Sequence, residues 1–188
     1  TVKVKLSQPF SRYFKDATSY DFGLGTLSST VVSGTGLAAK VQLALPATSG
    51  TFTSKIFDTT ASSSFGTLGR IVTTPPGTTL SVKARSSNDP AMTGAPAFST
   101  CAALTGGQDL SGGCVTDGHR YLQYELSLST ADPSVTPTLD DVTLNYDSTT
   151  TLSDSSDANF AIKSPKLTIT QQPATATAGV VVSPSITV

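Results

Sequence analysis

Short runs of alternating apolar and polar residues recur along almost the whole chain. In residues 120–128, Leu122, Tyr124, Leu126 and Leu128 alternate with polar side chains. A period of two places successive side chains on opposite faces, which predicts a β-strand with one buried and one solvated face. No window of ten or more residues has the 3.6-residue period of an amphipathic helix, and only residues 10–19 are candidates for a short helical turn. The chain is therefore expected to fold almost entirely from strands.

The predicted strands are separated by turns rich in glycine and proline. They span residues 1–6, 25–32, 38–45, 51–57, 68–74, 79–84, 120–128 and 138–146. The Asp140-Asp141 pair interrupts the alternation, so we expect the last strand to begin at about Val142. Uneven strand lengths and long loops favour two packed sheets over a closed barrel. The predicted fold is an all-β, antiparallel β-sandwich.

Composition divides the chain into four segments. We expect an N-terminal strand or extension in residues 1–19, the sandwich in 20–147, a polar linker in 148–166, and two short β-prone runs in 167–188. Two strands cannot bury a core alone, because an isolated hairpin is marginal in water. The last segment is therefore either the start of a further domain in a longer protein or a pair of strands that complete a sheet in another chain.

Few residues are charged, and this narrows the classes of partner. Charged residues make up 13% of the chain, and the net charge is −1. There is thus no basic field to attract nucleic acid or anionic lipid. No apolar run approaches the length of a membrane span, and no signal peptide is present, although a mature secreted protein would have lost it. Serine and threonine make up about three residues in ten, well above ordinary usage. A surface solvated by hydroxyls favours a location outside the cell.

The two cysteines sharpen this expectation. Cys101 and Cys114 flank the glycine-rich sequence CAALTGGQDLSGGC. A metal site would need further ligands, and the chain has one histidine, His119, and no pair of closely spaced cysteines. Two unrelated buried thiols are a second alternative. A disulfide is the simplest account; it would stabilise the fold by about 3 kcal/mol and would require an oxidising compartment.

Two parts of the sequence resemble known families. The pieces GTLSSTVVSGTGLAAKVQLALPATSGTFTSKIFD and VTDGHRYLQYELSLSTADPSVTPTLDDVTLNYD lie within residues 21–146, about two-thirds of the chain. They resemble jelly-roll-like β-sandwich modules of large bacterial surface and secreted proteins. The final 22 residues, LTITQQPATATAGVVVSPSITV, are similar to the first strands of bacterial immunoglobulin-like repeats but lack every later strand. The resemblance implies an extracellular accessory or structural module with no known chemistry.

Candidates for catalysis are few. His119 lies beside Asp117 and Arg120 at the start of a predicted strand. A catalytic triad needs a nucleophile and an orienting carboxylate around the histidine, and serine and threonine are too abundant here for such a pairing to be informative. We interpret His119 as a surface or turn residue and predict that the protein is not an enzyme.

Calcium is the one candidate cofactor. Asp140 and Asp141 could bind it together with backbone carbonyls, and Asp58 is a further candidate oxygen donor. The alternative is that Asp140 and Asp141 form a turn pair that blocks extension of the strand.

The preferred functional hypothesis is a fibre or pilus-like filament assembled by strand exchange. An open sheet edge can accept a strand from a neighbouring copy, and repeated head-to-tail contacts of this kind give a filament. Both ends of the chain offer apolar, β-prone donor segments. The candidate assembly residues are Val2, Val4, Leu6, Val180, Val181, Val182, Ile186 and Val188. The alternative keeps residues 1–6 in their own sheet and treats the C-terminal segment as part of a longer multidomain protein.

Carbohydrate binding or adhesion, as a module of a larger secreted protein, is the rival hypothesis. Sugar rings stack on exposed aromatic side chains, and this chain has no tryptophan. Tyr121 is the best candidate, with Tyr13 and Tyr20 weaker, and each could equally be a structural residue. The expected partners are copies of the same chain, or a polysaccharide under the rival hypothesis, at the cell surface or outside the cell.

Overall fold

A computed structural model describes residues 3–155 of the chain, with side chains from residue 11 to residue 148. The segment 167–188 and Val2 lie outside the described residues. Two five-stranded sheets pack face to face, and every strand pairing with a described register is antiparallel. The prediction of an all-β antiparallel sandwich is confirmed, whereas its likeness to a jelly roll stays a prediction.

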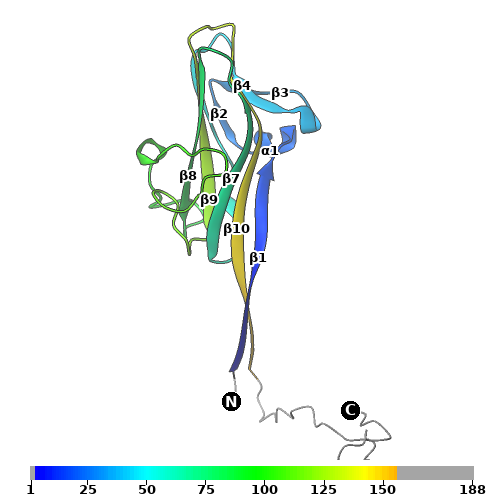
Figure 1. Cartoon of the computed structure of the whole chain (residues 1–188), viewed down its shortest axis with the longest axis vertical. Helices are drawn as coiled ribbons and strands as arrows, with labels where there is room; N and C mark the ends of the chain where they lie inside the picture. The colour runs from blue at the N-terminus through cyan, green and yellow to red at the C-terminus, as the bar shows by residue number, and fades with distance from the viewer. Residues whose placement is uncertain (1–2, 156–188) are drawn as a thin grey trace, which may run out of the picture. The chain divides into compact units, whose positions relative to one another are not determined.

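The first sheet is organised around its longest strand, β10. Its members are β1 (Lys3–Asp16), β3 (Thr30–Ser33), β4 (Lys40–Leu43), β7 (Ser63–Thr73) and β10 (Thr138–Ser155). Strand β10 pairs with β1, β4 and β7, and β3 pairs with β4. Strands β1 and β10, which are far apart in the sequence, therefore lie side by side (Figure 1).

The second sheet is organised around β9. Its members are β2 (Thr26–Ser28), β5 (Ser49–Thr53), β6 (Phe57–Asp58), β8 (Thr78–Ser87) and β9 (Tyr121–Thr130). Strand β9 pairs with β5, β6 and β8, and β2 pairs with β5. The described helices are short: α1 (Ser19–Gly23), η1 (Gly36–Ala38) and η2 (Phe98–Thr100). Within residues 3–155, no helix is both long and apolar enough to pass through a bilayer.

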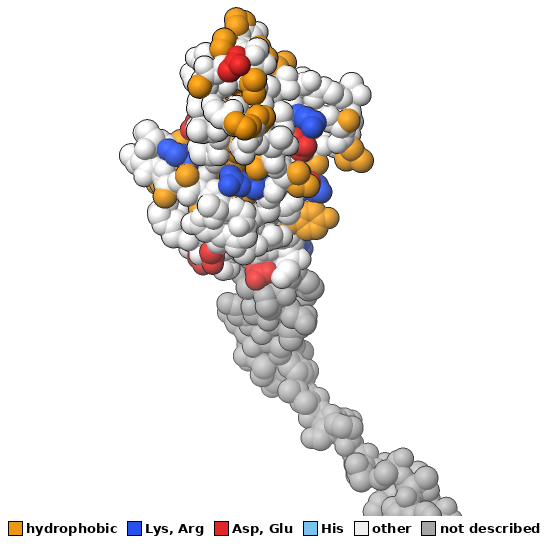
Figure 2. Space-filling model, turned by 45° about the horizontal axis from the view of Figure 1, so that its top comes forward, with side chains coloured by type: hydrophobic (Ala, Val, Ile, Leu, Met, Phe, Trp, Pro, Cys, Tyr) orange, Lys and Arg blue, Asp and Glu red, His pale blue; other side chains and the backbone are white. Residues whose placement is uncertain are grey.

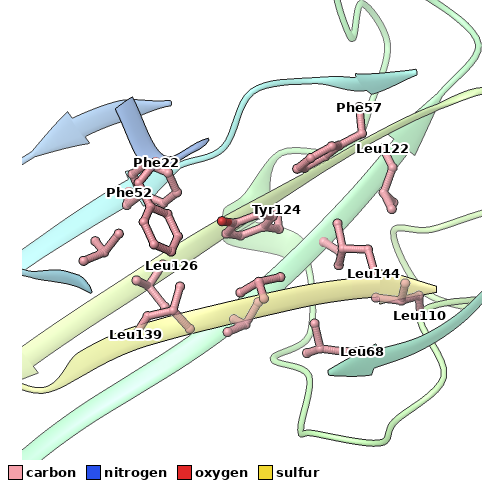
Figure 3. Close-up of a cluster of buried hydrophobic side chains, with 14 of the residues drawn as sticks. Phe22, Phe52, Phe57, Leu68, Leu110, Leu122, Tyr124, Leu126, Leu139 and Leu144 are labelled. Carbon is pink, nitrogen blue, oxygen red and sulfur yellow. The ribbon is translucent and has the colours of Figure 1, made fainter. Parts of the chain in front are cut away.

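The core lies between the sheets and follows the predicted alternation. All four apolar residues predicted on the inner face of β9 are buried (Figure 3). The ring of Tyr124 lies centrally, with its centroid 5.9 Å from that of Phe52 and 6.2 Å from that of Phe57. Burial of each such side chain contributes about 1.5–3 kcal/mol before ordering costs.

Strand β10 differs from the prediction at both ends. It begins at Thr138, because a register shift between Leu139 and Asp141 absorbs the acidic pair and leaves Leu139 and Val142 buried. It continues to Ser155, so residues 148–155 form strand where we expected the polar linker to begin. Backbone hydrogen bonds to neighbouring strands, which side-chain composition does not report, extend the strand through this polar stretch.

The N-terminal region also differs from the prediction. Most of the candidate helical segment 10–19 is strand instead, because β1 runs through to Asp16 as a partner of β10. The helix begins later, at Ser19. Thr18 and Asp21 form a capping box there, in which the Thr18 hydroxyl accepts from the Asp21 amide and the Asp21 carboxylate accepts from the Thr18 amide.

The predicted strand 25–32 is divided between the two sheets. Strand β2 joins the second sheet and β3 joins the first, and Ser29 between them has a left-handed φ of 54°. Gly50 lies against this crossing: a Cβ placed there would sit 2.6 Å from the Ser29 carbonyl oxygen. Only glycine leaves room for this close approach.

Candidate functional site

The predicted disulfide is confirmed. Cys101 and Cys114 are bonded, with 5.5 Å between their Cα atoms. The loop that they close reaches into the core, because Leu110, within it, is 1% exposed. The bond therefore anchors an irregular, glycine-rich segment that has no regular structure of its own.

This loop covers the edges of one strand in each sheet. Along β7, the amides of Gly107 and Leu110 donate to carbonyls of Leu68 and Gly66, each over 2.7 Å. Along β8, the Leu104 amide donates to the Val82 carbonyl over 2.7 Å. The loop is drawn in green beside these two strands (Figure 1). Edge groups that would otherwise face water are thus paired on this side of the sandwich.

On the β1 side, a buried carboxylate links the two sheets. Asp16, at the end of β1, is 0% exposed. Its carboxylate accepts a hydrogen bond from the Tyr124 hydroxyl over 3.0 Å and one from Lys55 Nζ over 2.9 Å. Burial raises the pKa of Asp16, although the hydrogen bonds from Lys55 and Tyr124 act in the opposite direction. Burial, together with the nearby Asp16 carboxylate, raises the pKa of Tyr124 well above its ordinary value.

His119 contacts a serine whose hydroxyl is also bonded to the turn before β9. Its Nδ1 lies 2.9 Å from the hydroxyl of Ser86, which is itself 0% exposed and accepts a hydrogen bond from the Thr116 amide. Asp117 instead accepts from the Phe65 amide and the Ser64 hydroxyl. The Ser86 hydroxyl thus contacts both His119 and the Thr116 amide, and it connects β8 to the turn before β9.

The aspartates named as calcium ligands are each paired with a cation of the protein. Asp141 lies 2.7 Å from Lys15, Asp140 lies 3.3 Å from Lys40, and the Asp58 carboxylate binds Arg120 through both oxygens. The hydrogen bond from Arg120 lowers the pKa of Asp58. In the described part of the chain, no three His, Cys, Asp or Glu side chains gather to hold a metal ion. The calcium site stays a prediction without geometric support here.

The expected order of exposure among the tyrosines is wrong, whereas a sugar-binding role for Tyr121 stays a prediction. Tyr121 is half-buried, and the Arg120 guanidinium lies 5.2 Å from its ring centroid. Tyr13 and Tyr20 are more exposed, at 64% and 74%. Tyr121 pairs with Asp58 of β6 and Ser87 of β8, and these neighbouring strands are not evident from the sequence.

The assembly residues are only partly described. Val4 and Leu6 belong to β1, which pairs with β10 of the same chain. For residues 3–6, this is the arrangement of the alternative in which the N-terminal segment stays in its own sheet. Val2 and the five candidates between Val180 and Val188 lie outside the described residues.

The outer face of the second sheet carries an array of hydroxyl groups that we did not anticipate. Strand pairing aligns one row across four strands: Ser28, Thr51, Ser127 and Ser81. It aligns a second row across three strands: Ser49, Ser129 and Thr79. These two rows line a shallow depression of about 480 Å³, which we call the hydroxyl groove.

The sequence held a signal for this groove. Serine or threonine occupies alternate positions in residues 49–53, 79–81 and 127–129, opposite to the apolar positions. This pattern indicates a strand face without charge, but not that the three segments lie side by side. By contrast, no local pattern marks Asp16 as buried.

No family model, curated protein or solved structure matches this chain. The jelly-roll and immunoglobulin-like resemblances therefore stay expectations from the sequence.

Proposed function

We propose that this chain is a non-catalytic structural protein that acts outside the cell and joins neighbouring copies by strand addition. The observation that carries the proposal is the difference between the edges of the sandwich. The disulfide-closed loop covers β7 and β8, whereas β1 pairs with β10 and with no other strand among the described residues. The outer edge of β1 is therefore the place where a strand from another copy would add.

The donor would be the C-terminal segment, residues 180–188. It is apolar and rich in β-branched residues, which favour extended structure. Phe14 on β1 is half-buried and stacks on Tyr146, with 4.7 Å between ring centroids. An added strand would extend this partly covered apolar surface. Each valine buried in this way would contribute about 1.5–3 kcal/mol before ordering costs.

The disulfide supports a location outside the cytosol. Such bonds persist in oxidising compartments and are rare where thiols are kept reduced. A surface solvated mainly by hydroxyls fits the same setting. On the face shown in Figure 2, charged side chains are few.

A cysteine cross-linking experiment tests strand addition. Full-length Tyr13→Cys chains are mixed with full-length Val182→Cys chains, and mixed disulfides are counted on a non-reducing gel. We expect dimers joined through these two positions, because a strand added beside β1 brings its apolar residues next to Tyr13. The matched control is Ile71→Cys, which is 59% exposed on β7 and should give far fewer dimers.

Removal of residues 167–188 provides the second readout. Strand addition predicts that the shortened chain is monomeric in sedimentation while the full chain forms larger species. If both chains have the same mass distribution, the C-terminal segment is not a donor. The alternative, a piece of a longer multidomain protein, would then be favoured.

A further inference from the structure

We infer that the hydroxyl groove is a binding site for a neutral polysaccharide. This inference goes beyond strand addition and does not depend on it, because the groove lies on the open face of the second sheet and β1 belongs to the first. It also differs from the sequence-based hypothesis, which relied on Tyr121.

The groove is an ordered array. Because paired strands lie about 4.8 Å apart and alternate residues repeat every 6.8 Å or so along a strand, the hydroxyls of the two rows are regularly spaced. The Thr79 and Ser129 hydroxyls are 2.6 Å apart and orient each other. The groove is held on rigid strands, whose inner faces carry the buried Phe52, Leu126 and Leu128.

The groove carries no charged side chain, and it ends where the residues around Phe98 cover the sheet. Of its ten lining residues, eight are serine or threonine and none is charged. The next row holds Glu125 and Lys83, which are register partners. Lys83 Nζ donates to the Phe98 carbonyl over 3.0 Å, and the Arg85 guanidinium lies 4.3 Å from the Phe98 ring centroid. Residues around Phe98 therefore cover the adjoining part of the sheet, while the hydroxyl rows stay open.

This chemistry favours a sugar polymer over a protein. Each serine or threonine hydroxyl can both donate and accept a hydrogen bond, which suits a ligand that is itself covered with hydroxyls. Protein interfaces instead have apolar centres enriched in aromatic residues and arginine. Among the residues that line the groove there is no aromatic or arginine side chain, and Leu128 on its floor is buried, so binding here would rest on hydrogen bonds from hydroxyls rather than on the ring stacking expected at Tyr121. Since no ion pair is offered, an acidic or sulfated polymer has no advantage over a neutral one.

The test uses the full chain and affinity electrophoresis in gels that contain a dextran, a soluble starch, a soluble β-glucan or a sulfated polysaccharide. We expect retardation by at least one neutral polymer and none by the sulfated polymer. Ser127→Lys, at the centre of the first row, should weaken this binding by about tenfold or more, because a long charged side chain would lie across the groove. Thr73→Lys, the same change on an exposed strand position of the first sheet, should leave binding unchanged.

Ser127→Ala is a second variant, for the case that the lysine variant does not fold. It removes the hydroxyl without adding bulk, so it should weaken binding less than Ser127→Lys does. The inference is overturned if no neutral polymer retards the chain, if only the sulfated polymer does, or if correctly folded Ser127→Lys and Ser127→Ala chains both bind like the parent. None of these outcomes bears on strand addition, which is scored by cross-linking at Tyr13.

Discussion

The two lateral sides of the sandwich protect their strand edges by different means. At β7 and β8, a loop closed by the Cys101–Cys114 bond supplies backbone partners and inserts Leu110 into the core. At β1, the strand instead carries the exposed Arg12, while Lys15 forms an ion pair with Asp141 on β10 and the end of the strand is anchored by the buried Asp16. The first side is sealed by covalent closure, whereas the second relies on charge, which deters unwanted pairing but leaves the backbone accessible. Four experiments would break or sharpen this contrast.

The largest effect should come from opening the loop. Replacing both cysteines, Cys101→Ser with Cys114→Ser, should lower the free energy of unfolding by about 3 kcal/mol, because the unfolded chain regains the freedom of an open loop. Denaturant unfolding measures this loss. Hydrogen exchange of the Leu104 and Leu110 amides should accelerate relative to amides of β10. Unchanged protection at Leu104 and Leu110 would show that the loop holds its place without the bond.

The next effect concerns the anchor of β1. Asp16→Ala should destabilise the fold by about 2 kcal/mol, because Lys55 and the Tyr124 hydroxyl lose their shared acceptor in a buried setting. Asp16→Asn is the matched control, since its amide oxygen can still accept from Tyr124, and it should lose less. Equal stability of the alanine variant and the parent, measured by denaturant unfolding, would remove Asp16 as an anchor.

The pH dependence of stability should reveal the same group. Burial raises the pKa of Asp16 in the folded state above its unfolded value of about 3.9. The native state therefore binds this proton more tightly, so the stability contributed by protonation of Asp16 is fully present below the unfolded pKa and is lost as pH rises through the folded pKa. Asp21, Asp58 and Asp132 have lowered pKa values and act in the opposite direction, so the parent must be compared with Asp16→Asn. Parallel stability curves for the two chains would contradict the assignment.

The smallest effect on stability, and the most direct on association, should come from the edge charges. Arg12→Ser with Lys15→Ser should lower the melting temperature only slightly, through loss of the Lys15–Asp141 ion pair, because both replaced side chains are exposed. It should increase self-association in sedimentation experiments, because the open edge of β1 loses its charge protection. Lys40→Ser with Arg70→Ser removes the same charge elsewhere in the first sheet and serves as the control. Equal association of the two double variants would mean that net charge, rather than the β1 edge, governs association.

Local sequence pattern predicted the parts of this protein whose structure depends on one segment at a time. The alternation of residues 122–128 determined which face of β9 is buried, because side chains in any strand point alternately to opposite sides. The spacing of Cys101 and Cys114 in a loop with little other support predicted their bond. Recurrent strands with glycine and proline turns were sufficient to predict an antiparallel sandwich.

Features that depend on two or more segments were decided only by tertiary structure. The polar residues 148–155 form strand because β10 has neighbours to pair with. Asp16 is buried where Tyr124 of the opposite sheet and Lys55, in the connection between β5 and β6, meet it. The hydroxyl groove exists because strand register aligns Thr51, Ser127 and Ser81. Composition and periodicity indicate which face of a segment is exposed to solvent. Strand register and the choice of partner strand depend instead on contacts between residues far apart in the chain.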